Sequence, residues 1–235
     1  MATWWTRATD DVSRRRINAR HDLDPKRGDP APAASGDGVS QRLGHHVDQV
    51  VTASGEEPLP FVALENIGSR TGRLLPDAEV PLRVPEPTGM TSFRGGDVLF
   101  GKLRPYLAKS WRADRTGICS TELIVMRPRP TVDARWLGYL AQSDLLVEWA
   151  VATSEGVKMP RTSWEKLRLL ELDAPSVDEQ RAIADYLDAE TARIDSVAAA
   201  RRRVAALASL RLGYLANQDS SLSRTKPMTP FEHRS

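Results

Sequence analysis

The chain has 235 residues and a formal net charge of +2, which allows one domain with an extension and does not by itself demand a nucleic-acid partner. Its one cysteine, Cys119, excludes a disulfide framework and a multi-cysteine zinc site. The sequence has no run of about 18 apolar residues and no apolar N-terminal segment. We therefore expect a cytoplasmic protein that is neither secreted nor membrane-bound.

The N-terminal residues, 1–40, are rich in Pro, Gly and charge, so we expect a disordered leader. Contact between DNA and the triple arginine at residues 14–16 is a lesser alternative. Order is expected to begin near Gln41, with a first strand over residues 59–65. Residues 74–90 are proline-rich and predict a long surface loop, a kind of segment that often carries recognition.

Residues 93–128 contain a stretch that is far more basic than the chain as a whole. Between Arg94 and Arg115 there are six Lys or Arg against two Asp. Three apolar runs in this stretch predict strands over residues 97–101, 106–111 and 121–127. A sheet with cations beside its strands suits a polyanion such as nucleic acid.

Helical spacing follows from residue 131 to residue 153, and Asp133 and Ser143 are placed to cap two short helices. Residues 166–172 alternate apolar and charged side chains, which predicts a last strand. Ser176 and Glu179 then form a capping box that starts a further helix.

This last helix is predicted over residues 176–218, a length of about 60 Å. Its acids lie mostly in the first half and its arginines in the second, which would suit antiparallel pairing with a like helix. The alternative is a long helix that packs only on its own domain. Residues 219–235 predict a disordered tail. The apolar side chains at three- and four-residue spacing, with Glu190 and Arg201 interrupting them, are the predicted partner-binding residues: Ile183, Leu187, Ile194, Val197, Val204 and Leu207.

The sequence offers no clear catalytic apparatus. The adjacent His45 and His46 are more simply a solvated pair than a metal site. Asp97 and Glu122 lack the Glu-x-Lys sequence that a metal-dependent nuclease would need after them. There is no P-loop, no base-methylation motif and no histidine near Cys119 in sequence. We expect a binding protein with no metal site and no cofactor of its own.

Several blocks, in order, resemble the target-recognition domain of the specificity subunits of type I restriction–modification systems. Together the blocks cover residues 41–217, and each is weak alone but the ordered set is specific. They are residues 63–68, 96–109, 117–122, 156–161, 175–184 and 187–195.

The resemblance implies an α+β fold, with one globular target-recognition domain over residues 41–175 and a mixed or antiparallel sheet. A long coiled-coil-like helix, residues 176–218, follows it. The resemblance also implies a non-catalytic subunit used in phage defence, which binds one half of a bipartite site in double-stranded DNA. The methylation and restriction subunits that dock on it would use S-adenosylmethionine, ATP and magnesium.

Typical members contain two recognition domains and two helices, whereas this chain has one of each. We therefore expect a half-size subunit that forms a homodimer through the long helix and recognises an inverted repeat. Other readings stay open: a truncated inactive fragment, a stand-alone DNA-binding protein or nuclease, or a scaffold that gathers protein partners.

The resemblance also divides the candidate DNA contacts. Cations inside the matching blocks are shared by proteins with different targets, so they are expected to bind phosphates: Lys102, Arg104, Lys109, Lys158 and Arg161. For Arg104 and Arg161 a salt bridge within the fold is an equal alternative. Base contacts are expected from the less similar segments, residues 70–91, 112–116 and 154–158, and nearby arginines: Arg70, Arg73, Arg83, Arg94, Arg112 and Arg115.

Overall fold

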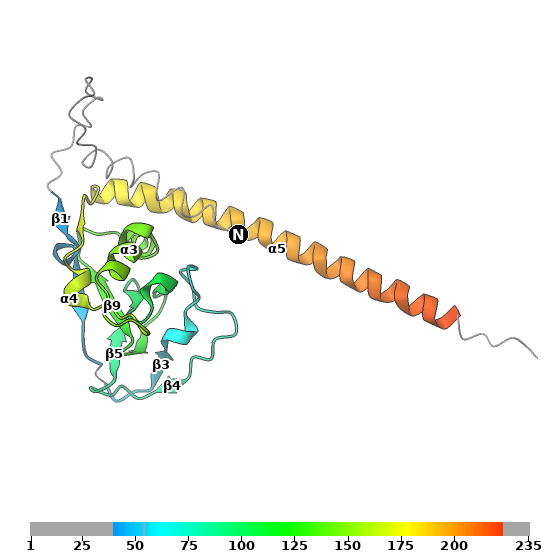
Figure 1. The fold of residues 1–235 in the computed structure, drawn as a ribbon, viewed down its shortest axis with the longest axis horizontal. Helices are drawn as coiled ribbons and strands as arrows, with labels where there is room; N and C mark the ends of the chain where they lie inside the picture. Colours follow the sequence, from blue (N-terminus) through cyan, green and yellow to red (C-terminus); the bar gives the residue numbers. More distant parts are fainter. Residues whose placement is uncertain (1–39, 54, 223–235) are drawn as a thin grey trace, which may run out of the picture. The chain divides into compact units, whose positions relative to one another are not determined.

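The computed structural model describes residues 40–53 and 55–222, with side chains described as far as residue 211 (Figure 1). The predicted leader and most of the predicted tail lie outside these residues. The chain divides into two compact units, one ending at Ala184 and the other beginning at Asp185. In the described part, no helix is long and apolar enough to cross a membrane.

Two four-stranded sheets form the first unit. In the first sheet the order is β2-β9-β6-β7, and all its pairs are antiparallel. In the second the order is β4-β3-β8-β5, and β3 and β8 are parallel. The bounds of the first sheet are β2 Val47–Val50, β9 Leu123–Pro128, β6 Val98–Gly101 and β7 Ser110–Arg112. Those of the second are β4 Leu82–Arg83, β3 Leu59–Val62, β8 Gly117–Ser120 and β5 Met90–Phe93.

The remaining elements are short helices and one two-stranded ladder. The helices of the first unit are α2 Ala134–Leu140, α3 Asp144–Ala152 and α4 Trp164–Leu167 (Figure 1). Single 3-10 turns occur at η1 Leu43–His45, η2 Leu64–Asn66 and η3 Pro105–Leu107, and β1 Gln41–Arg42 pairs with β10 Glu171–Leu172. The predicted α+β class with antiparallel and mixed sheets is confirmed.

The apolar runs of the central strands are explained by burial of both faces. Along β6, Val98 and Phe100 pack with Trp136 and Leu137 of α2, whereas Leu99 belongs to the cluster of Phe93 and Trp111. Successive side chains point to opposite faces of a strand, so every β6 side chain enters one core or the other. The first sheet is therefore the middle layer between the helices and the second sheet.

The predicted caps hold. The Asp133 carboxylate accepts hydrogen bonds from the backbone N–H groups of Arg135 and Trp136 at the start of α2, and Ser143 caps α3. Ser176 and Glu179 form the predicted capping box, with Glu179 N–H donating to Ser176 Oγ and Ser176 N–H to Glu179 Oε2. The helix that follows, α5, spans Val177–Leu222, about 70 Å of helix and four residues beyond the predicted end.

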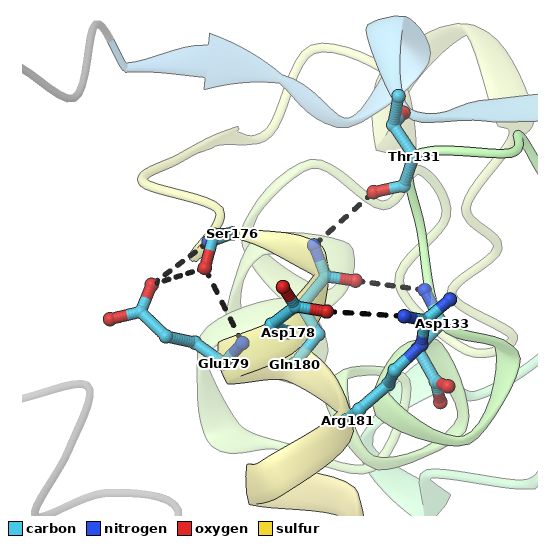
Figure 2. A network of polar contacts seen from close by, with 7 residues as sticks. All are labelled: Thr131, Asp133, Ser176, Asp178, Glu179, Gln180 and Arg181. Atoms are coloured by element: carbon cyan, nitrogen blue, oxygen red, sulfur yellow. Dashed lines mark hydrogen bonds and ion pairs between the residues drawn. The ribbon is translucent and has the colours of Figure 1, made fainter.

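One side chain ties the first turn of α5 to the α2 cap within the first unit (Figure 2). Gln180 is 1% exposed. Its amide oxygen accepts from the backbone of Asp133 at 2.8 Å, and its amide nitrogen donates to the carbonyls of Pro175 and Thr131 at 2.9 and 3.4 Å. Ile183 and Ala184, one turn on, are also buried or half-buried against this unit's core.

Some strand predictions are wrong in position. The strand predicted over residues 106–111 is β7, which starts only at Ser110, because Pro105 and two left-handed residues, Arg104 and Ala108, turn the chain before it. The strand predicted over residues 166–172 is instead α4 followed by two strand residues. Leu167 and Leu170 are three residues apart, a helical spacing, and both are buried in the core between the short helices and the first sheet.

A buried ion pair holds the start of β6. Asp97 is 1% exposed, and its carboxylate accepts hydrogen bonds from Arg127 Nε and Nη2 at 2.9 and 2.7 Å. It also accepts from the backbone N–H of Arg94 at 2.9 Å, which closes the turn that contains Gly95 and Gly96.

We expect Asp97→Ala to lower the free energy of unfolding by about 3 kcal/mol, because Arg127 would be left without its buried partner. Urea denaturation measures this. Asp114→Ala removes the exposed pair with Arg115, in which the side chains are 62% and 55% exposed, and should cost less than about 1 kcal/mol. Equal losses in the two variants would contradict the assignment.

Candidate nucleic-acid interface

Three segments that are distant in sequence are joined through their backbones. Arg104 N–H donates to Pro160 O at 2.8 Å, and Thr162 N–H donates to Lys102 O at 3.0 Å. Gly101 N–H donates to Lys109 O at 2.8 Å, and Arg70 N–H donates to Ala108 O at 3.3 Å. The segments around residues 70, 101–109 and 160–162 therefore lie side by side.

This arrangement gathers the predicted phosphate-binding residues and one predicted base-contacting residue. We call the set the cationic strip: Arg70, Lys102, Arg104, Lys109, Lys158 and Arg161. Arg70, Arg104, Lys158 and Arg161 are exposed, whereas Lys102 and Lys109 are half-buried. Cations that share one surface raise the local concentration of a polyanion, so the strip is the strongest candidate for a nucleic-acid contact.

The backbone of the strip is unusual. Among the described residues, three that are not glycine have positive φ, namely Arg70 at 55°, Arg104 at 50° and Ala108 at 46°. All three are in the joined segments, and the left-handed conformation costs an ordinary residue about 1–2 kcal/mol. Such strain tends to persist at functional sites because the surrounding structure enforces it.

Carboxylates lie beside several strip cations. Arg161 pairs with Glu122 at 3.1 Å, and Arg70 pairs with Asp144 at 3.4 Å. The salt-bridge alternative for Arg161 is therefore observed. The sequence pattern did not point to Glu122 or Asp144 as counter-charges, because they are 39 and 74 residues from their partners.

Lys109 has a structural contact. Its ammonium donates to the carbonyl of Leu64 at 3.0 Å, so it fastens η2 to the hairpin formed by β6 and β7. This engagement makes Lys109 the least available of the predicted phosphate-binding cations.

A second cationic group lies at the opposite end of the β6–β7 hairpin. Val98 pairs with Arg112 there, whereas Phe100 pairs with Ser110 near the strip. Arg112 is the last residue of β7, and Arg94 and Arg115 lie in the connections that follow β5 and β7. Gly96 N–H donates to Ala113 O at 2.9 Å and joins these two connections. The hydrogen bond from Arg115 lowers the pKa of the Asp114 carboxyl, so that pair is ionised at neutral pH.

The other two predicted base-contacting residues lie elsewhere. Arg73 is in the loop after Arg70, where its carbonyl accepts from Gly68 N–H at 3.0 Å. Arg83 lies on β4, with its guanidinium carbon 4.2 Å from the centroid of the Phe61 ring. The structure therefore divides the six predicted base-contacting arginines among separate places.

Residues 155–161, which include Lys158 and Arg161 of the strip, form a closed loop. Glu155 and Arg161 exchange two backbone hydrogen bonds of 3.0 and 2.8 Å, and Gly156 has a φ of +92° that favours glycine. Lys166 binds Glu155 at 2.6 Å, which lowers the pKa of that carboxyl. The tip presents Val157 fully to solvent, with a relative exposure of 104%.

The side chains that could have served in catalysis have structural contacts or are buried. Asp97 is held by Arg127, and burial raises the pKa of the Cys119 thiol to about 12, so the thiol stays protonated. Burial, together with neighbouring His45 and Arg129, lowers the pKa of His46. Within the described residues, no three His, Cys, Asp or Glu side chains are grouped to hold a metal ion.

The predicted partner-binding residues of the helix fall into two sets. Ile183 packs against the core of the first unit, which the pattern alone did not reveal. Leu187 is half-buried. The rest are exposed apolar side chains in the second unit: Ile194 at 46%, Val197 at 49%, and Val204 and Leu207 at 67%.

The α+β domain followed by one long helix is similar in fold to solved specificity subunits of type I restriction–modification systems, so the predicted resemblance is confirmed at the level of the fold. The HsdS subunit from Thermoanaerobacter tengcongensis superposes with a TM-score of 0.60 and 21% identity, over 86% of this chain and 53% of that chain. A structure described as the basis of complex assembly and conformational transition of the type I R-M system gives a TM-score of 0.62 and 21% identity, over 85% of this chain and 53% of that one.

This chain therefore spans about half the length of both solved structures. No protein-family model matches the chain, and no curated protein matches it.

Proposed function

We propose that this chain is the non-catalytic specificity subunit of a type I restriction–modification complex. Its first unit binds one half of a bipartite site in double-stranded DNA. The observation that carries the proposal is the cationic strip, which three backbone hydrogen bonds between distant segments assemble on a fold of this class. A binding role suits the engaged state of Asp97 and Cys119.

The geometry supports separate groups of side chains for phosphate contacts and for base contacts. The strip cations bind phosphates and set the register of the protein on the duplex. Base contacts come from side chains beside the strip and from the second cationic group, Arg94, Arg112 and Arg115. The two groups are separated by the hairpin strands, about 10 Å at 3.3 Å per residue, so they can contact different parts of one groove.

The proposed partners are those that the similarity to type I specificity subunits implies. Methylation and restriction subunits dock on it and use S-adenosylmethionine, ATP and magnesium, in the cytoplasm where phage DNA enters. In this proposal a second copy of the chain supplies the other half-site. The exposed apolar side chains of α5 are the surface on which the second copy packs.

The direct test is co-expression with a type I methylation subunit, followed by single-molecule sequencing of genomic adenine methylation. The expected result is a bipartite, inverted-repeat motif that is absent when this chain is omitted. Absence of any new methylated motif, with both proteins shown to be folded and associated, would contradict the proposal.

Lys102→Ala should weaken binding to every duplex sequence, because one phosphate contact is lost. The slope of log K against the logarithm of the salt concentration should become shallower by about 0.9. Fluorescence anisotropy at several salt concentrations measures both. Arg42→Ala is the matched control, since Arg42 lies on β1, which pairs with β10 and not with any of the joined segments. Equal effects of the two variants would mean that only net charge matters.

The homodimer is tested by light scattering at several protein concentrations. We expect a dimer at micromolar concentration, and Val204→Asp should favour the monomer because it places a charge among apolar side chains. Ala206→Asp adds the same charge about 200° around the helix at 100° per residue, and should leave the dimer intact. A wild-type chain that remains monomeric throughout would overturn this part of the proposal.

A further inference from the structure

The apolar seam of the second unit contains two charged residues. Leu187, Ile194, Val197 and Val204 recur at heptad spacing, with Glu190 and Arg201 occupying the seam positions between them. The steps along this seam alternate between three and four residues, which is the pattern of a two-helix coiled coil. Ile194, Val197 and Val204 are 46%, 49% and 67% exposed, so this face has no cover within the described chain.

Charge decides which arrangement of two copies this seam allows. A parallel pair in register would set each Glu190 against its own counterpart and each Arg201 against its own, and like charges in facing positions are destabilising. An antiparallel pair brings the acidic part of one helix beside the basic part of the other. The seam therefore favours an antiparallel partner.

Among antiparallel registers, one satisfies every seam position. Centring the pair between Asp195 and Ser196 sets Glu190 against the partner's Arg201, Ile194 against the partner's Val197, and Leu187 against the partner's Val204. A shift of one heptad in one direction would place Glu190 against the partner's Ile194. The opposite shift would place Arg201 against the partner's Val197. Both shifts bury a charge against an apolar side chain, which costs free energy.

We propose that a second copy of this chain packs antiparallel on residues 187–204, in the register that pairs Glu190 with the partner's Arg201. Two-fold symmetry makes this ion pair twice, once at each end of an apolar centre built by Ile194 and Val197. The pair fixes the register in the way that polar residues in coiled-coil seams do, at some cost in stability. This register rests on the homodimer proposed above.

The isolated helix already holds Glu190 beside Arg193, at 3.4 Å, with side-chain exposures of 41% and 75%. An exposed pair of this kind contributes about 0–1 kcal/mol, so Glu190 can leave Arg193 and pair with the partner's Arg201 at little cost in free energy. Arg202 and Arg203 are also exposed, but they lie outside the seam and cannot replace Arg201 in this register.

The test is a charge exchange in the full chain, with the dimer dissociation constant measured by sedimentation equilibrium. Glu190→Arg should raise that constant at least about tenfold, because two like-charge contacts replace two ion pairs. Adding Arg201→Glu should restore it to within about threefold of the wild-type value. Adding Arg202→Glu instead gives the same net charge and should not restore it.

Oxidative cross-linking tests the register separately. The double variant Leu187→Cys with Val204→Cys should give a covalent dimer, since the two positions in one chain are about 25 Å apart along the helix. Each single variant should stay uncrosslinked, because in this register neither position 187 nor position 204 faces its own copy in the partner. The one native cysteine, Cys119, is 0% exposed and does not interfere.

The outcomes separate the two proposals. A wild-type dimer that is unaffected by Glu190→Arg, or that cross-links through either single cysteine, overturns the register but leaves the homodimer. A wild-type chain that stays monomeric overturns both. Circular dichroism of each variant at low concentration checks that the helix content of the monomer is unchanged.

Discussion

The hydrogen bonds between residues 102–104 and 160–162 are the constraint on which the candidate interface depends. Without them the loop at residues 155–161 would belong only to the segment between α3 and α4, and Arg161 would be far from Lys102. The bonds are made by main-chain atoms, Arg104 N–H to Pro160 O and Thr162 N–H to Lys102 O. They therefore fix the positions of the cations while leaving the side chains free to vary.

Gathering like charges on one surface costs free energy, and the structure offsets that cost locally. Glu122 faces Arg161, Asp144 faces Arg70, and Glu155 faces Lys166 just outside the strip. Pairs of this kind on a surface contribute about 0–1 kcal/mol, so a phosphate can replace a carboxylate at little cost. The same acids would weaken contacts with weakly held, non-specific DNA. A cation that is already paired in the free protein is thus compatible with the proposed role.

The sequence predicted those parts of the fold that local chemistry controls. Asp133, Ser143 and Ser176 each bring a side-chain oxygen to a helix N-terminus, and all three caps are observed because capping involves residues only two or three apart. An apolar run predicts a strand over residues 97–101, and β6 is observed at Val98–Gly101. The structure gives the reason for the apolar run, since both faces of the strand are buried.

Long-range pairing could not be predicted in the same way. The apolar side chains around Tyr106 alternate like those of a strand, yet Pro105 and the left-handed Arg104 and Ala108 form a turn. Leu167 and Leu170 fit a strand or a helix, and the core decides for the helix. The acidic partners of Arg70 and Arg161 are even harder to predict from the sequence, because no local rule connects residues that only the fold brings together.

The long helix illustrates a further limit of local rules, since its function depends on which of its faces is left open. Ile183 has the same apolar character as Ile194, but the first is packed on a core and the second is 46% exposed. Apolar exposure repeated at Ile194, Val197 and Val204 along one face is what a partner helix would bury. Glu190 and Arg201 would be faults in a helix that packs on an apolar surface. In a pair of antiparallel copies they face each other, and the two apparent defects then specify the arrangement of the pair.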